Sequence, residues 1–276
     1  MIKIAILLST YNGANFLNDQ IESILNQTNK EWNLFIRDDG SSDETITIIN
    51  KYINSHNNIV LLEDMEIRRN ACNSFLWMLD KIEANYYMFC DQDDVWLPNK
   101  IDVLYGSMLI EEQRAQGKPI LINTDLIVAG SNLNIIAESF WKFANINPYM
   151  IGEKYLIITN YITGCTTFFN HRVKEIAFPV SNTAIMHDYW IALSVFKHKG
   201  SIISLPIATV IYRQHNLNTL GAIKYSNSLF EKFKNIRKII HYNAQLYKMV
   251  KSTKDISIIF FLRMKLFYYV SILFKK

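Results

Sequence analysis

Short apolar runs alternate with segments of helical periodicity along the first half of the chain. Residues 2–8 are nearly all apolar, which is typical of a strand buried on both faces. From about Ala14, apolar side chains recur every three or four residues, as on one face of a helix. The alternation continues with strands predicted at 34–36, 59–62 and 86–90, and helices predicted around 46–53 and over 70–83. Strands that alternate with helices predict an α/β fold with a doubly wound, mostly parallel sheet.

The second half of the chain has a weaker pattern. A helix is predicted from Pro98 to about Arg114, and residues 130–151 are predicted to form a long loop. A helix is also expected from His187 to Phe196. Further strands are expected at 120–122, 163–169, 202–205 and 208–212.

Residues 224–276 differ from the rest of the chain in charge. This tail contains 12 Lys or Arg against 2 Asp or Glu, a balance of +10. The chain as a whole has a net charge of +4, so residues 1–223 carry −6. An acidic body with a basic tail is not typical of a nucleic-acid-binding domain, and we expect no nucleic-acid partner.

The tail is also predicted to be helical. Apolar residues recur at helical spacing over 224–250, and residues 256–276 are mostly apolar. That second stretch is long enough to span a bilayer, but Arg263 and Lys265 near its middle each cost about 2.5–3.5 kcal/mol there. We therefore favour an interfacial amphipathic helix with peripheral membrane contact, or a helix packed on the body. A solvated basic face on a core helix is the alternative.

Polar clusters follow three of the predicted strands. They are Ser9–Asn12, Asp38–Asp39 and Asp91–Asp94. Parallel α/β sheets bind ligands at the carboxyl ends of their strands, so these clusters are predicted to form one site. Carboxylate oxygens suit Mg²⁺ and Mn²⁺. In isolation the acidic turn could equally be a solvated loop or a helix cap; its place at a strand end favours a site.

Cysteines and glycines exclude several other classes of site. Cys72, Cys90 and Cys165 are an odd number without a C-x-x-C pair, which argues against a disulfide framework or a zinc site. The apolar run at 2–8 is too short for a signal peptide, so we expect a cytoplasmic protein. The nine glycines form neither G-x-G-x-x-G nor a P-loop. A metal ion is therefore the expected counter-charge for any bound phosphate.

The polar clusters resemble the motifs of family 2 glycosyltransferases with the GT-A fold. The motifs are Leu8–Gly13, Arg37–Asp43 and Asp91–Asp94. Together with His187–Trp190 and Tyr212–Asn216, the stretch Asp91–Pro98 is most similar to the branch that contains bacterial rhamnosyltransferases of surface polysaccharide assembly. The resemblance covers about residues 1–220. It implies a GT-A catalytic domain at 1–223 followed by the helical tail at 224–276.

The resemblance also implies a reaction and a role for each motif residue. One sugar would pass, with inversion, from a nucleoside diphosphate sugar to a saccharide acceptor, with Mg²⁺ or Mn²⁺ as cofactor. Asp188 would be the general base. An acceptor carried on a membrane lipid suits the basic tail and implies a location at the inner face of the cell membrane. The nucleotide sugar would contact Ser9, Tyr11, Asn12, Asp39, Arg69, Asp91 and Gln92; the metal would bind Asp93 and His215; Asp94, Gly164 and Trp190 would line the acceptor side.

Other interpretations of the same residues stay open. Asp188 could cap the helix that follows it. The donor could be dTDP-rhamnose or a UDP-linked hexose or N-acetylhexosamine. A sugar nucleotidyltransferase has a similar layout but needs a glycine-rich loop that Leu7–Gly13 does not provide. A nucleotide-sugar binding module without catalysis is disfavoured by the acidic turn together with Asp188.

Overall fold

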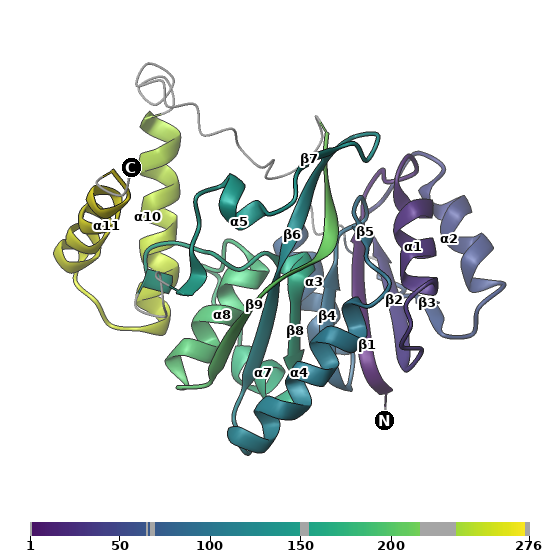
Figure 1. Cartoon of the computed structure of the whole chain (residues 1–276), viewed down its shortest axis with the longest axis horizontal. Coiled ribbons are helices and arrows are strands. Elements are labelled where there is room, and N and C mark those ends of the chain that lie inside the picture. Colours follow the sequence, from purple (N-terminus) through teal and green to yellow (C-terminus); the bar gives the residue numbers. More distant parts are fainter. Residues whose placement is uncertain (1, 65, 67–69, 150–154, 216–235, 274–276) are drawn as a thin grey trace.

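A mixed β-sheet forms the centre of the molecule in the computed structural model, which describes residues 2–64, 66, 70–149, 155–215 and 236–273. The strands follow the order β3-β2-β1-β4-β8-β6-β9-β5, and β7 pairs with β6 (Figure 1). The strands are β1 (Ile2–Thr10), β2 (Trp32–Asp38), β3 (Ile59–Leu61), β4 (Ala84–Cys90), β5 (Val95–Trp96), β6 (Ile120–Gly130), β7 (Ile135–Ala137), β8 (Thr167–Asn170) and β9 (Ser201–Gln214). The helices are α1 (Leu17–Leu25), α2 (Thr45–Ile53), α3 (Ala71–Lys81), α4 (Lys100–Arg114), α5 (Phe140–Phe143), α7 (His171–Ala177), α8 (His187–Lys197), α10 (Ile236–Thr253) and α11 (Ile258–Leu273), with a 3₁₀ turn at Gly164–Thr166.

Strands β3, β2, β1 and β4 form a parallel half-sheet, as the sequence predicts. Side chains of β1 alternate between two hydrophobic cores, because successive residues of a strand point to opposite faces. Ala5 and Leu7 pack in one core, and Ile4, Ile6 and Leu8 pack in the other. Burial on both faces explains why this strand is continuously apolar.

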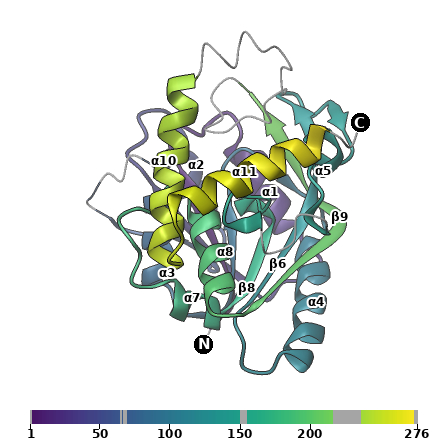
Figure 2. The ribbon, with the colours of Figure 1, turned by 90° about the vertical axis from the view of Figure 1, so that its left-hand side faces the viewer.

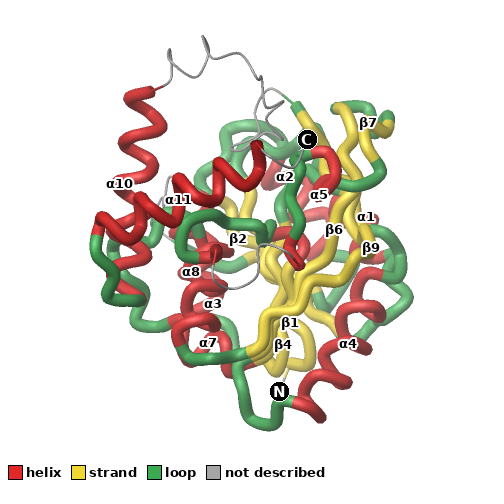
Figure 3. The backbone as a smooth tube through the Cα atoms, turned by 60° about the vertical axis from the view of Figure 1, so that its left-hand side comes forward, coloured by secondary structure: helices red, strands yellow, loops and turns green. Residues whose placement is uncertain are grey.

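Helices cover both faces of the sheet, which confirms the doubly wound α/β fold (Figure 3). Helices α3, α7 and α8 bury residues in the first core. Helices α1, α2 and α4 bury residues in the second. Because β1 pairs in parallel with both β2 and β4, the carboxyl ends of these three strands lie at one edge of the sheet, and the polar clusters follow there.

The second half of the sheet departs from the sequence prediction. The strands expected at 202–205 and 208–212 are one long strand, β9, parallel to β6 with a shifted register where Pro206 interrupts the pairing. The expected strand at 163–169 begins as a 3₁₀ turn and becomes the antiparallel strand β8 only at Thr167. The predicted loop at 130–151 contains β7 and α5 in its described part. The short β5 and helix α7 were not predicted.

The described part of the tail consists of two helices that pack against the body. Leu246, Met249 and Val250 of α10 are buried in the first core, together with Ile256 and Phe261. The predicted helical tail is thus confirmed from Ile236 onward, and residues 224–235 lie outside the described residues. Within the residues that the structure describes, none of the helices combines the length and apolarity that crossing a bilayer requires.

Candidate active site

The loops after β1 and β2 are joined by a hydrogen-bond network around Asn12. Asn12 has a positive φ of 47°, which an asparagine tolerates better than most residues. Its N–H donates to Ser41 Oγ at 2.8 Å, and its Oδ1 accepts from the N–H of Ser42 at 2.9 Å. Asp38 accepts from the N–H groups of Gly40 and Ser41. The two predicted nucleotide-binding loops are therefore held together by their own polar groups.

Gln92 ties the acidic turn to the loop after β1. Its Oε1 accepts from Thr10 Oγ1 at 2.6 Å and from the N–H of Tyr11 at 2.9 Å, and its Nε2 donates to the carbonyl of Tyr11. A Cβ at position 13 would lie 2.3 Å from Gln92 Oε1, so a larger residue at Gly13 would displace the Gln92 side chain from these hydrogen bonds. Tyr11 itself is 57% exposed, and its ring is available at the surface of the site.

Arg37 anchors Asp39 at the end of β2. The guanidinium is fully buried and donates to Asp39 Oδ1 at 2.9 Å and to Asp64 Oδ2 at 2.9 Å. It also donates to Ser74 Oγ at 2.8 Å. Ser9, half-buried on β1, lies beside Arg37 in the sheet register. Arg69, the remaining residue predicted to contact the nucleotide, lies outside the described residues.

The acidic turn brings three carboxylates into close proximity immediately after β4. Asp91 and Asp93 are half-buried, whereas Asp94 is fully buried. Burial, reinforced by the neighbouring carboxylates, raises the pKa of both Asp91 and Asp94. Oδ2 of Asp94 has no hydrogen-bond partner within the described part of the chain. The turn therefore gathers carboxyl groups whose ionised forms the described residues stabilise only in part.

The carboxyl end of β9 closes over the acidic turn. The N–H of Arg213 donates to Asp94 Oδ1 at 3.2 Å, and its guanidinium donates to the carbonyl of Asp93 at 2.9 Å and to Asp19 Oδ2 at 2.7 Å. His215 Nε2 lies 2.8 Å from Asp93 Oδ2, and its ring stacks on Phe16 with the centroids 4.5 Å apart. The structure thus brings together Asp93 and His215, which are 122 residues apart in the chain.

Asp188 stands at the start of α8 with its carboxylate held by backbone donors. Its Oδ2 accepts from the N–H of Gly164 at 3.1 Å, and its Oδ1 accepts from the N–H of Tyr189 at 2.6 Å. Burial raises the pKa of Asp188 to about 6, although these hydrogen bonds and one from Asn160 oppose the shift. The charge of Asp188 contributes to the raised pKa of Asp91, so the two groups are close. Asp188 is both a helix-start residue and a carboxylate next to the acidic turn.

The His187 ring packs between two aromatic side chains. Its ring lies 4.2 Å from the ring of Phe75 and 4.6 Å from that of Phe89. Burial lowers the pKa of His187 to about 3, so the ring is neutral. A Cβ at Gly164 would lie 2.7 Å from its Nε2, which explains the glycine in the turn that holds Asp188.

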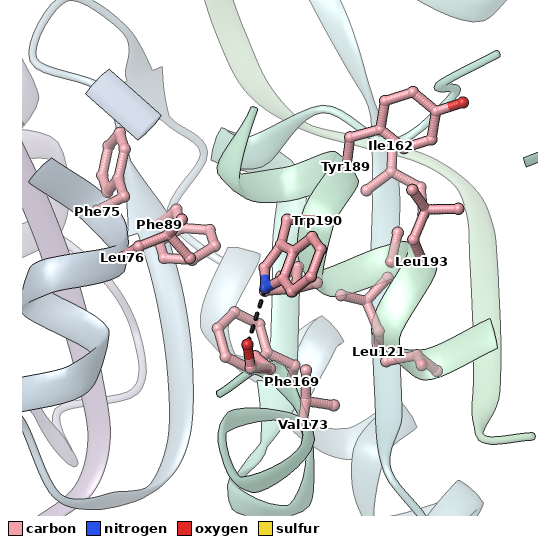
Figure 4. Close-up of a cluster of buried hydrophobic side chains, with 14 of the residues drawn as sticks. Phe75, Leu76, Phe89, Leu121, Ile162, Phe169, Val173, Tyr189, Trp190 and Leu193 are labelled. Atoms are coloured by element: carbon pink, nitrogen blue, oxygen red, sulfur yellow. Dashed lines mark hydrogen bonds between the residues drawn. The ribbon is translucent and has the colours of Figure 1, made fainter. Parts of the chain in front are cut away.

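Trp190 lies in the hydrophobic core rather than at an open surface. Only 6% of the residue is exposed, and its indole N–H donates to the carbonyl of Ala177 at 2.8 Å. Figure 4 shows the indole above Phe169 and Val173, with this hydrogen bond dashed. Helix α8 buries residues around most of its circumference, so its sequence does not distinguish a core face from a ligand face. The packing gives Trp190 a structural role in the core, and its contact with the acceptor stays a prediction.

The residues of the acidic turn suit a divalent cation. One ligand atom each from Asp91, Asp94 and Cys165 lies within 4.8 Å of the others, and Asp93 with His215 forms the adjacent pair. Hard cations prefer the carboxylates, and Mn²⁺ also accepts imidazole. Burial raises the pKa of Cys165 and keeps it a neutral thiol, which is a poor ligand for such ions. The orphaned Asp94 Oδ2 marks where additional positive charge would be stabilised.

Several residues of the site carry no local sequence signal. Lys100 is fully buried, and its Nζ donates to the carbonyl of Cys165 at 2.8 Å. Burial lowers its pKa to about 8. Arg213 and Asn160 likewise reach the acidic residues from distant parts of the chain. Only the position of Arg213 beside His215 at a strand end could have drawn attention to it.

Ligands of open α/β sheets bind in the crevice at the carboxyl ends of the strands, and the buried carboxylates of this protein lie at that edge. Residues 5–176 match the sequence model described as "Glycosyl transferase family 2". The chain therefore belongs to glycosyl transferase family 2, and it is a glycosyltransferase with the GT-A fold.

Similar proteins include two transferases and a solved structure. The UDP-Glc:alpha-D-GlcNAc-diphosphoundecaprenol beta-1,3-glucosyltransferase WfgD of Escherichia coli is 27% identical over 197 residues, 70% of this chain and 70% of that protein. The dTDP-rhamnosyl transferase RfbG of Shigella flexneri is 31% identical over 98 residues, 34% of each chain. The mannosyltransferase PcManGT of Pyrobaculum calidifontis, solved with GDP-Man and Mn²⁺, superimposes with a TM-score of 0.58 at 13% identity, covering 90% of this chain and 69% of that one.

Proposed function

We propose that the protein transfers one sugar, with inversion, from a nucleoside diphosphate sugar to a saccharide acceptor in the assembly of a surface polysaccharide. The observation that carries this proposal is the Gly164–Asp188 contact beside the acidic turn. It places a carboxylate with a raised pKa close to the residues that would hold the leaving group. A single base and no covalent intermediate is what a one-step inverting displacement requires.

Asp188 is the proposed general base. A sugar hydroxyl is a poor nucleophile, so a carboxylate must accept its proton as the new bond forms. The pKa of Asp188, raised to about 6, makes it a stronger base than an exposed aspartate while it stays ionised near neutral pH. The N–H groups of Gly164 and Tyr189 fix the orientation of its carboxylate.

The acidic turn and His215 are the proposed cofactor and diphosphate site. Asp93 and His215 would hold Mg²⁺ or Mn²⁺, with Asp91 directed toward the ribose and Asp94 supporting the turn from the acceptor side. The ion would act as a Lewis acid on the departing diphosphate. The Mn²⁺ bound to PcManGT, a protein of the same fold, supports this assignment. Ser9, Tyr11, Asn12, Asp39 and Gln92 would bind and orient the nucleotide.

The donor and acceptor are proposed as a class with two candidates. The motifs favour dTDP-rhamnose, and the name of RfbG supports it. The longer alignment is with a transferase named for UDP-Glc, which supports UDP-glucose as the second candidate. The lipid diphosphate acceptor in that name supports a lipid-linked acceptor for this protein. With such an acceptor, the catalytic unit at 1–223 would work at the inner face of the cell membrane. The tail at 224–276 would contact that membrane.

The test of the proposed function is the Asp188→Asn variant. We expect transfer to fall by about 10²–10⁴-fold, because the amide cannot accept the hydroxyl proton. Donor binding in the presence of Mn²⁺, measured by calorimetry, should persist. Normal turnover by this variant would show that Asp188 is not the base. Thermal-shift screening of dTDP-rhamnose, UDP-glucose and other nucleotide sugars with Mn²⁺ or Mg²⁺ distinguishes the two donors, since a bound ligand stabilises the folded state.

A further inference from the structure

Helix α11 presents an apolar surface on the outside of the molecule. Ile259, Phe260, Leu262, Leu266, Phe267 and Val270 are between 38% and 67% exposed, and we term them the α11 outer face. Figure 2 shows α11 lying across the outside of the molecule, over α8 and beside α10. A helix that is apolar around its circumference is typically covered on all sides. Among the residues that the structure describes, only one side of α11 is covered.

The opposite side of α11 fixes its orientation. Phe261 is buried, with its ring 5.4 Å from that of Tyr247 in α10. Lys265 donates to Asn243 of α10, and Tyr268 packs on Tyr155 with ring centroids 5.5 Å apart. The α11 outer face is therefore held outward by contacts with the body, and the helix cannot bury it by rolling inward without losing them.

An apolar groove continues this surface toward α8. It has a volume of about 500 Å³, and Phe260 is shared between the groove and the α11 outer face. Ile157, Phe196 and Met264 contribute apolar lining. Lys254 and Asp255 lie in the same groove, and Lys254 Nζ is 5.0 Å from the ring of Phe196. Because Asp255 offsets the charge of Lys254 there, the groove contributes apolar surface, and attraction to a negative headgroup has to come from the other exposed Lys and Arg of the tail.

The charge of the tail determines which occupant fits. Arg263 is exposed on α11, and Lys248, Lys251 and Lys254 are exposed nearby in sequence. A second copy of the chain would bring two tails of balance +10 together and would press Arg263 into an apolar interface. An anionic bilayer accepts both features, because its acyl region takes apolar side chains and its phosphates attract cations.

We propose that the α11 outer face binds the surface of a bilayer containing anionic phospholipid, with α11 parallel to the membrane plane. The apolar side chains enter the boundary between headgroups and acyl chains, and the exposed Lys and Arg contact lipid phosphates. This deepens the proposed function and rests on it for the lipid-linked acceptor. It names the helix and the lipid class responsible for membrane contact. Because α10 and α11 bury side chains in the first core, the described part of the tail holds this surface in a fixed place on the catalytic unit.

The test is co-sedimentation of the full chain with vesicles of phosphatidylglycerol and phosphatidylcholine in equal parts. We expect binding that weakens with added salt and with vesicles of phosphatidylcholine alone. Replacing Ile259, Leu266 and Phe267 by serine should lower the partition coefficient by about 100-fold or more, since each buried apolar side chain contributes strongly. The matched control is Ile135→Ser with Ile136→Ser on β7, where the side chains are similarly exposed, and it should bind as wild type does.

Three outcomes would overturn the proposal. Wild-type protein could fail to sediment with anionic vesicles, or the triple variant could bind as strongly as wild type. The triple variant could also convert a dimer to a monomer in ultracentrifugation without any vesicle binding, which would assign the α11 outer face to a second copy. Thermal shifts with UDP or dTDP and Mn²⁺ on the same proteins separate the two proposals. Loss of vesicle binding with an intact nucleotide shift affects only the membrane surface, whereas absence of a nucleotide shift in wild type affects only the proposed function.

Discussion

Carboxylates lie in the loops after two strands of the parallel half-sheet, β2 and β4, and their surroundings shift carboxyl pKa values in opposite directions. After β2, Asp43 accepts hydrogen bonds from the Thr45 hydroxyl and from the N–H of Ala14. Burial opposes ionisation there, but these hydrogen bonds outweigh it and lower the pKa of Asp43. After β4, burial and neighbouring carboxylates raise the pKa of Asp91 and Asp94. The ionised form is therefore favoured at Asp43 and disfavoured at Asp91 and Asp94.

This difference in pKa shift distinguishes residues that hold the shape of the site, termed the scaffold, from residues that are proposed to take part in the reaction. The loops after β1 and β2 satisfy their own polar groups and so hold a fixed shape for a ligand. The acidic turn and Asp188 keep ionisable groups in surroundings that disfavour their charge, which is common at functional sites. Such groups are expected to cost stability in the free protein and to gain it when a cation or substrate arrives. Variants in the two groups should therefore have opposite effects on unfolding.

The largest effect is expected from Arg37→Met in the scaffold. The substitution removes the buried cation that donates to Asp39, Asp64 and Ser74. We expect a loss of about 3–5 kcal/mol in the free energy of unfolding, because breaking a buried ion pair leaves uncompensated charge. Urea unfolding followed by circular dichroism measures it. Arg37→Lys keeps the charge with fewer donors and should lose less; equal stability of Arg37→Met and wild type would contradict the scaffold role.

Asp188→Asn is expected to raise the free energy of unfolding, whereas Arg37→Met lowers it. Because the folded-state pKa of Asp188 is about 6, above the usual aspartate value of about 3.9, the ionised form destabilises the fold above pH 6 and the penalty fades as pH falls toward 4. Removing the charge should stabilise the protein by about 1–2 kcal/mol at pH 8, after allowing for a weakened hydrogen bond. The gain should disappear near pH 4.

Asp38→Asn is the matched control in the scaffold, since Asp38 accepts from two backbone N–H groups and the Ser41 hydroxyl. It should lower the unfolding midpoint in the same urea titration. If Asp38→Asn and Asp188→Asn lowered the free energy of unfolding equally at pH 8, the proposed difference between the two groups of carboxylates would be wrong.

The parallel half of the fold was predictable because its signals are local. Residues 2–8 read as a strand because β1 is buried on both faces. By contrast β9 was divided in two because Pro206 breaks its apolar run, although pairing with β6 continues on both sides. The two-residue β5 exists through its pairing with β9, which no local pattern reveals.

The site shows the same division between local and distant signals. The sequence predicted a site at Asp38–Asp39 and Asp91–Asp94 because both clusters follow predicted strands. The structure brings them to one edge of the sheet. The contacts that set their electrostatics join residues far apart in the chain, such as Lys100 with Cys165 and Arg213 with Asp19. The family resemblance, not a local pattern, assigned Trp190 to the acceptor side, and the nearly complete burial of α8 left no pattern that states which of its faces meets the core.

A smaller effect is expected in the pH dependence of transfer, where the proposed base should set the acidic limb. Because Asp188 must be ionised to accept a proton, kcat/KM should fall about tenfold per pH unit below pH 6. Initial rates at low acceptor concentration and saturating metal ion measure this limb. A profile that stays flat down to pH 5 would contradict the assignment of Asp188 as base, whereas a limb that remains in Asp188→Glu at a shifted pH would sharpen it.

The smallest effect is expected at Asn12, whose side chain joins the two scaffold loops. Asn12→Gly keeps the positive φ but loses the hydrogen bond from the N–H of Ser42, so we expect a loss of about 1 kcal/mol in unfolding free energy. Asn12→Ala loses the same bond and also strains the left-handed backbone, which should add about 1 kcal/mol. Urea unfolding of the pair separates the two contributions. Equal losses would mean that the loop relaxes its backbone, and that its shape is less fixed than the hydrogen-bond network indicates.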